Sequence, residues 1–237
     1  MMRRALFTIA AVIICLTSAG RDLNDRLQNR PYADLRTWHL GFGVGVNVQD
    51  MLFTHNGFTT PEGESWFMEQ PSFSPGFNLC GVADLRLNRW LNLRVTPGML
   101  FGNRSIKMRE AYSGLTLSQN IKTVYIACPI EIKYSALRYR NARPYIAGGI
   151  MPALNVTKIR HEYLKLNAAD CFLTIGAGCD FYLPYFKLIP ELKFCFGLTD
   201  VIDRHRPDLT DEPDRLKITQ SLKKATTSMV ILTFYFE

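Results

Sequence analysis

The sequence has 237 residues, of which 47% are apolar and 21% charged, and its 28 Lys and Arg against 21 Asp and Glu give a net charge of +7. This composition excludes a disordered chain, and the length allows one large domain or two small ones. The mean hydropathy is -0.02, and no apolar run reaches the roughly 18 residues that a membrane-spanning helix needs. A polytopic helical membrane protein is therefore excluded, whereas a membrane β-barrel is not, because its alternating strands average to neutral hydropathy.

The first residues have the layout of a secretory signal peptide. Arg3 and Arg4 form a basic start, the stretch from Ala5 to Leu16 is apolar, and small residues follow it. This layout predicts a signal peptide over residues 1–19 that is removed on export. The residue before Cys15 is too large for a lipoprotein site, so no lipid anchor is expected there.

An odd number of cysteines remains after cleavage, at irregular spacing. This is a poor framework for disulfides in an exported protein, and no Cys/His spacing suits zinc. We therefore expect these residues to act as small apolar side chains in strands. They are Cys80, Cys128, Cys171, Cys179 and Cys195.

From Trp38 onward, apolar residues alternate with polar or small ones, the pattern of a β-strand with two unlike faces. In the first such segment Trp38, Leu40 and Phe42 share one face, while His39 and three glycines share the other. In a soluble sandwich that glycine-rich face would meet solvent, whereas in a narrow barrel it meets a crowded lumen. The alternation marks eight segments, at residues 38–47, 77–87, 91–101, 124–134, 143–156, 171–181, 188–198 and 228–236.

The connections between these segments alternate in length. Long ones cover residues 48–72, 103–119, 157–168 and 200–224, and short ones cover 88–90, 137–142 and 183–185. This alternation places every long connection at one end of an up-and-down barrel. The predicted fold is all-β: an eight-stranded antiparallel up-and-down transmembrane β-barrel over residues 38–237, with short periplasmic turns and long outer loops. Such a chain is an integral protein of the bacterial outer membrane with periplasmic termini, and residues 20–37 form its periplasmic N-terminal segment.

Large aromatic residues cluster at the strand ends beside the short turns and the termini. Their abundance follows from the preference of aromatics for strands, but their one-ended distribution does not. In a barrel they would form a ring at the periplasmic interface of the membrane, where aromatic side chains are enriched. The predicted girdle comprises Trp38, Trp90, Tyr139, Tyr145, Tyr185 and Phe236.

Charged residues on the opposite strand face are predicted to fill the lumen. The interior of an eight-stranded barrel is narrow enough for side chains to occupy, and buried charges need partners. Because both signs occur in similar number, we expect a structural network of paired charges; a proton or ion path is the alternative, and a diffusion pore is not expected. The set is Asp84, Arg86, Arg94, Glu131, Lys133, Asp180, Lys187, Glu191 and Lys193.

No catalytic, cofactor or metal site is predicted. The chain has no GxSxG motif, and a dyad of His55 with Ser65 is the remaining enzymatic alternative. Basic residues and prolines interrupt the acidic stretch from Asp200 to Asp214, which favours a solvated loop over a calcium site. No cluster of Lys and Arg with interleaved aromatics is present, so nucleic acid is not an expected partner. The positive charge instead favours contact with anionic lipid headgroups of the membrane.

Several segments resemble the eight-stranded outer-membrane β-barrel family of Bacteroidota. Residues 125–134 (YIACPIEIKY) resemble that family's descending strand, in which an acidic and an aliphatic residue usually stand at the positions of Ala127 and Cys128. Residues 143–149 (RPYIAGG) resemble the strand that follows, and residues 190–200 (PELKFCFGLTD) resemble the seventh strand. The resemblance implies the same barrel fold.

The start of the mature chain resembles the PorT subgroup. Residues 29–36 (NRPYADLR) and 38–47 (WHLGFGVGVN) are similar to a Pro-x-x-Asp segment followed by a His-aromatic-Gly-Phe strand ending in Asn, with Leu40 in place of the usual aromatic. PorT proteins are components of the type IX secretion system. The resemblance therefore implies a non-enzymatic role in export or assembly of secreted proteins, with other secretion-system subunits as partners. The open alternative is a stand-alone surface barrel for adhesion or envelope integrity.

Overall fold

A computed structural model of the protein describes residues 29–55, 66–72, 74–110, 116–157, 167–201 and 222–237. A short 3-10 helix, η1, precedes the strands at Ala33–Leu35. The strands are β1 (Trp38–His55), β2 (Trp66–Ser72), β3 (Pro75–Arg86), β4 (Leu91–Val95), β5 (Gly98–Glu110), β6 (Thr116–Ala127), β7 (Ile130–Ser135), β8 (Ala142–Asn155), β9 (Ala169–Tyr182), β10 (Lys187–Gly197) and β11 (Leu222–Phe236). The predicted signal peptide lies outside the described residues.

These strands form one antiparallel sheet that closes into a ring. β1 pairs with β3, and β3 pairs with both β4 and β5, which follow each other along one position of the ring. The next position is shared by β6 and β7, and β8, β9, β10 and β11 follow in order. β11 pairs with β1, which closes the ring. The ring counts as eight barrel strands, because β4 continues into β5 after a short interruption at Pro97 and β6 continues into β7 after one at Pro129. The proline nitrogen has no hydrogen to donate, yet both proline carbonyls accept backbone bonds from neighbouring strands. The predicted eight-stranded antiparallel barrel is confirmed.

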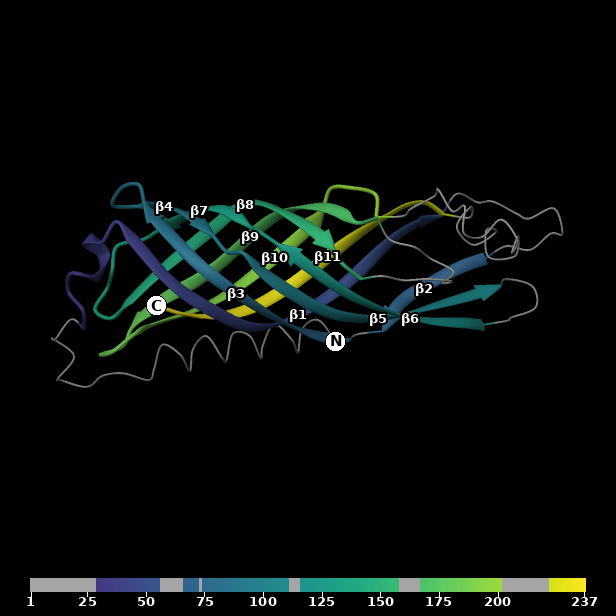
Figure 1. Ribbon diagram of the computed structural model, residues 1–237, viewed down its shortest axis with the longest axis horizontal. Helices are drawn as coiled ribbons and strands as arrows, with labels where there is room; N and C mark the ends of the chain where they lie inside the picture. The colour runs from purple at the N-terminus through teal and green to yellow at the C-terminus, as the bar shows by residue number, and fades with distance from the viewer. Residues whose placement is uncertain (1–28, 56–65, 73, 111–115, 158–166, 202–221) are drawn as a thin grey trace, which may run out of the picture.

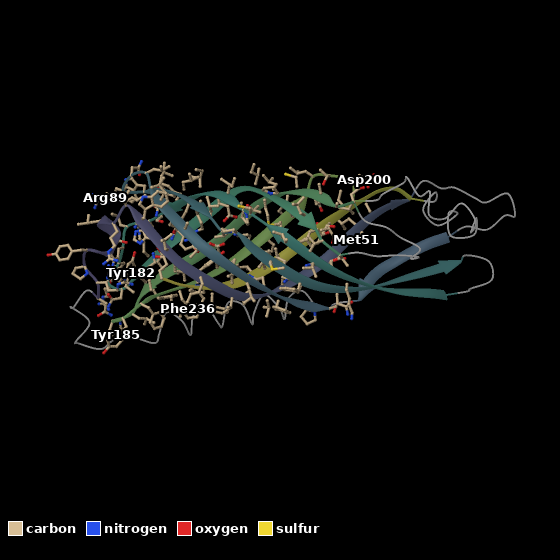
Figure 2. The ribbon with its side chains drawn as sticks, in the orientation of Figure 1. Met51, Arg89, Tyr182, Tyr185, Asp200 and Phe236 are labelled. Atoms are coloured by element: carbon tan, nitrogen blue, oxygen red, sulfur yellow. The ribbon has the colours of Figure 1, made fainter. Side chains whose placement is uncertain are left out.

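One end of the ring, here called the short-turn end, carries the connections at residues 87–90, 136–141 and 183–186. Figure 1 shows η1 and the end of β11 at this end, while β2, β5 and β6 project beyond the ring at the other. Figure 2 places Arg89, Tyr182 and Tyr185 at the short-turn end and Met51 and Asp200 toward the opposite one. The predicted separation of short and long connections is therefore present in the structure.

The strands are longer than predicted on the side of the long connections. β1 continues to His55 instead of ending at Asn47, and β5 and β6 extend as a paired ribbon through residues predicted to be a loop, 103–119. β11 begins at Leu222, before the predicted start at Ser228. The backbones of these extensions are paired, β1 with β11 and β5 with β6. A strand that extends beyond the membrane does not need an apolar residue at every second position. The sequence of these extensions therefore lacks the alternation from which the other strands were predicted.

Within the ring, side chains alternate as predicted between an exposed outer face and a buried lumen. On β1, Leu40 and Phe42 are 71% and 59% exposed, whereas Asn47 and Gln49 on the inner face are buried. This exposed apolar belt suits a lipid environment, where hydrocarbon replaces water against the outer face. Among the described residues, no helix has the length and apolar character needed to cross a membrane.

The lumen has two layers of different chemistry. The layer next to the short-turn end holds charged side chains among Val82, Tyr145, Ala147, Ile189 and Tyr235. The second layer, further along the ring, is apolar and is formed by Leu100, Tyr125, Ala127, Met151, Ala153, Phe172, Cys195, Met229 and Ile231. Sequence reasoning predicted the polar filling but not this apolar layer, whose members stand on the inner face where polar residues were expected.

Candidate functional site

The candidate site is a network of buried charges in the lumen, contributed by β3, β4, β7, β9 and β10. Every member has a relative exposure of 4% or less, and Arg94 has none. These side chains lie on the inner face because they occupy alternate positions of strands whose other residues are apolar. The lumen network consists of Asp84, Arg94, Glu131, Lys133, Asp180, Lys187, Glu191 and Lys193.

Arg94 lies at the centre of the network. Its Nε and Nη2 donate to the two carboxylate oxygens of Asp84 at 2.8 and 2.9 Å, and its Nη1 donates to Oε2 of Glu191 at 2.6 Å. The Tyr145 hydroxyl donates to the same Glu191 oxygen at 2.6 Å. The guanidinium also lies over the rings of Tyr145 and Tyr235, at 5.1 and 5.2 Å from their centroids. Arg94 thus joins β3, β8, β10 and β11 across the lumen.

Three lysines complete the network around Arg94. Lys133 Nζ is 2.8 Å from Asp180 and 3.7 Å from Asp84. Lys193 Nζ is 2.8 Å from Glu131 and 3.1 Å from Glu191.

Three further contacts involve Lys187 and Glu131. Lys187 lies between Asp180, at 3.7 Å, and the C-terminal Glu237 side chain, with which it forms an ion pair. The remaining oxygen of Glu131 accepts the Thr174 hydroxyl at 2.8 Å. Each lysine therefore contacts two carboxylates, and each carboxylate is held by at least one cation.

The balance of charge identifies what the network does chemically. Its four carboxylates face four cations, so the charges of the eight network residues balance. Buried charges are tolerated only when paired in this way, because removal of one partner leaves the other desolvated without compensation. The arrangement cross-links strands and fills the lumen.

The apolar layer reinforces this closure. Phe172 and Met151 are fully buried, and the Phe172 ring packs edge-on against Tyr125 with centroids 6.2 Å apart. Between the two layers lies a cavity of about 30 Å³ lined in part by Asn78, Thr96 and Lys193. That volume has room for about two water molecules, at roughly 10–15 Å³ each by this measure. Side chains of the two layers therefore occupy most of the described part of the lumen.

Two residues depart from their predicted places. Arg86 is not part of the lumen network: it lies half-buried at the short-turn mouth, where it lines a recess with Arg89, Arg138 and Arg143. Tyr145 is not part of the exterior girdle, because it stands on the inner face of β8, 4% exposed, with its hydroxyl on Glu191. Sequence reasoning assigned it by its closeness to a short turn, whereas the side-chain parity of β8 decides its direction.

The other predicted girdle residues lie on the outside near the short-turn end. Trp38 and Tyr139 are exposed, and Tyr185 is 93% exposed at the tip of its turn. Phe236 stacks on Phe42, with centroids 5.3 Å apart. Trp90 stacks on Tyr134, at 6.4 Å. Their contact with the membrane interface stays a prediction.

Sequence reasoning missed the residues that hold the N-terminal segment across the short-turn mouth. Asp34 accepts a hydrogen bond from the Tyr182 hydroxyl and lies 3.3 Å from Nη1 of Arg143. Arg138 donates to the backbone oxygen of Arg30 at 3.3 Å, and its guanidinium lies 3.6 Å from the centroid of the Tyr182 ring. These contacts join positions more than a hundred residues apart, so no local pattern signals them.

The structure offers little for catalysis or metal binding in the part that it describes. No group of three or more His, Cys, Asp or Glu among the described residues is placed to hold a metal ion. The cysteines from Cys80 to Cys195 are free thiols. Ser65 and most of the acidic stretch 200–214 lie outside the described residues, as does the side chain of His55.

Two solved structures illustrate what the chain is similar to. The N-terminal β-barrel domain of Pseudomonas aeruginosa OprF is 11% identical, with 81% of this chain and 96% of that one covered and a TM-score of 0.36. The outer membrane protein OprG from Pseudomonas aeruginosa is 11% identical, with 84% and 91% covered and a TM-score of 0.41. No curated protein matches the chain.

The family comparison supports the same environment as the apolar outer belt. Residues 26–203 match the family model described as "Outer membrane protein beta-barrel domain". The match covers most of the chain and most strands of the barrel. The chain therefore belongs to the outer membrane protein β-barrel domain family and is an integral β-barrel of the bacterial outer membrane.

Proposed function

We propose that the protein is a sealed, non-enzymatic barrel that serves the type IX secretion machinery through its surfaces and not through its lumen. The observation that carries this proposal is the filled lumen, in which paired charges and an apolar layer occupy the described part of the interior. We propose that such a filled barrel acts by binding or by anchoring. The resemblance of residues 29–47 to PorT proteins supplies the secretion role.

The proposed orientation places the short-turn end in the periplasm, as in outer-membrane barrels with short periplasmic turns. The segment from Asn29 and the end of β11 both lie at this end. Arg30 joins the two directly, since its Nη1 donates to the backbone oxygen of Glu237 at 3.2 Å. The periplasmic face of the barrel is then built largely from its own N-terminal segment.

This face presents apolar side chains outside the lipid-facing belt. Tyr32 and Leu35 on the N-terminal segment are 75% and 63% exposed, and Leu137 on the neighbouring turn is exposed as well. Leu35 and Leu137 line the same recess at the mouth. Exposed apolar groups beside charged ones are typical of protein–protein contact sites. We propose that this surface contacts other secretion-system subunits.

The test is deletion of the gene followed by analysis of proteins in the culture fluid. Loss of secreted proteins is expected, with restoration by the wild-type chain. Complementation by the double variant Tyr32→Ser/Leu35→Ser is expected to fail, while the control variant Arg36→Ser on the same segment restores secretion. Unchanged secretion in the deletion strain would reject the role. Defective adhesion or envelope leakage in that case would favour the stand-alone barrel.

A further inference from the structure

The outer surface of the barrel carries a hollow on β7 to β10. It measures about 530 Å³. Two small outward residues create it: Gly148 pairs with Ile132 on one side and Ile175 on the other, and Ala177 pairs with Ile146 and Leu192. These two small residues form the floor of the hollow, and the larger side chains of their strand neighbours form its walls. The large side chains that line it are Ile132, Tyr134, Ile146, Ile175, Leu192 and Phe194.

The glycine at the floor is not required by backbone packing. A Cβ at Gly148 would meet only the carbonyl oxygen of Thr174, at an ordinary 3.5 Å. At the adjacent Gly149, which faces inward, a Cβ would collide with the Ile130 backbone. An alanine at position 148 would therefore fit, so strand pairing does not by itself require the glycine at the floor of the hollow.

The chemistry of the hollow suits hydrocarbon. Its walls are aliphatic and aromatic, with the Tyr134 hydroxyl as the polar exception among the side chains. Since the protein is an integral barrel, this surface lies against lipid. A hollow that matches one acyl chain adds dispersion contacts that a smooth surface does not provide.

Positive charge lies beside the hollow at its short-turn edge. The Tyr134 ring stacks on Trp90, and the Arg89 guanidinium lies 5.6 Å from the centroid of the Trp90 ring. Arg89 and Arg86 open onto a recess of about 370 Å³ that they share with Arg138, Arg143 and Asp34. Four arginines thus face one carboxylate, which leaves the recess strongly positive.

The arginines of the recess differ in their partners. Arg143 donates to the backbone oxygens of Ala136 at 2.9 Å and Arg89 at 2.7 Å, and also to Asp34. Arg138 is held by Asn141 and by backbone oxygens. The Arg86 and Arg89 guanidinium groups, in contrast, have no hydrogen-bond acceptor within the described parts of the chain. They are the two cations available to an external anion.

We propose that the hollow and these two arginines bind one anionic phospholipid, with an acyl chain over Gly148 and Ala177 and the phosphate on Arg89 and Arg86. Guanidinium groups recognise phosphate by charge-assisted, often bidentate, hydrogen bonds. The apolar hollow is followed, toward the short-turn end, by the two arginines, just as the acyl chain of a phospholipid is followed by its charged headgroup. The proposal depends on the outer-membrane location and not on the role in secretion.

The experiment is native mass spectrometry of the full chain purified in detergent, with added phosphatidylglycerol or phosphatidylcholine. The wild-type protein is expected to retain one phosphatidylglycerol and to prefer it over phosphatidylcholine. Gly148→Leu is expected to lose the bound lipid, and Arg86→Gln/Arg89→Gln to weaken phosphatidylglycerol binding by about tenfold or more, to the level of phosphatidylcholine.

The matched control is Gly81→Leu, on the outer face of β3, where a Cβ meets only the Pro97 oxygen at 3.9 Å. This variant is expected to bind lipid like the wild type. Heat-modifiable migration on gels verifies folding, and Ala177→Leu replaces Gly148→Leu if the latter does not fold. Equal lipid binding by the Gly148 and Gly81 variants would overturn the proposal. So would displacement of the lipid by inorganic phosphate alone, which would indicate a free-anion site, or recovery of a polypeptide in the hollow from native membranes.

Discussion

Arg94 and Asp84 form a two-point ion pair across adjacent strands, with Nε–Oδ1 and Nη2–Oδ2 distances of 2.8 and 2.9 Å and both side chains buried. They are directly opposite each other in the β3–β4 register. The pairing of two neighbouring strands therefore also fixes the central contact of the lumen network, and Arg94 extends it to Glu191 on the far wall.

Arg94→Met is expected to destabilise the barrel by about 3–5 kcal/mol, because Asp84 and Glu191 would lose a cation in a buried setting. Urea unfolding of the protein in lipid vesicles measures the effect. Arg36→Met is the control, since Arg36 is exposed on the N-terminal segment outside the network, and a change within about 0.5 kcal/mol is expected there. Equal destabilisation by the two variants would contradict the assignment of Arg94 as the centre of the network.

The wild-type protein is expected to show no stable conductance steps in planar bilayers, because the charged and apolar layers close the lumen. A porin inserted under the same conditions serves as the positive control. A reproducible large conductance would reject the filled lumen and, with it, the proposal that the protein acts through its surfaces.

The adjacent glycines of β8 are expected to respond differently to the same substitution. Gly149→Ala places a methyl group against the Ile130 carbonyl and is expected to destabilise the barrel by about 1–3 kcal/mol. Gly148→Ala meets ordinary contacts, and a change of less than about 1 kcal/mol is expected. Unfolding in lipid vesicles compares the pair. The same loss of stability in both would show that the two positions do not differ in the space available to a Cβ.

Asp34→Ala is expected to loosen the N-terminal segment from the mouth while leaving the barrel intact. The variant removes the acceptor of the Tyr182 hydroxyl and the ion pairs to Arg143, at 3.3 Å, and Arg138, at 3.7 Å. Faster proteolysis within residues 29–37 is the expected result, with unchanged heat-modifiable migration of the barrel. Arg36→Ser, on the same segment, is expected to be cleaved at the wild-type rate. An unaltered cleavage rate for the Asp34 variant would mean that other contacts hold the segment.

Much of the site was predictable because the side-chain period of a strand is a local property. Alternation placed Asp84, Arg94 and Glu131 on the inner face, and the prolines at 97 and 129 did not change that parity. The same rule, applied to every residue of β8, would have placed Tyr145 inward; its closeness to a turn was the weaker signal. The extended β5–β6 ribbon escaped prediction because its pairing is not recorded in an apolar stripe.

The sequence by itself determined the fold class, the number of barrel strands, the two faces of each strand and the end at which the short turns gather. These properties follow from the alternation of apolar residues and from the lengths of the connections along the chain. Only the tertiary structure decided which charges meet and that the Tyr145 hydroxyl binds Glu191. It also decided that an apolar layer fills the lumen beyond the charges, and that Gly148 and Ala177 share one hollow near the arginines of the mouth. These relationships depend on how closure of the ring staggers one strand against the next, and that stagger joins residues far apart in sequence.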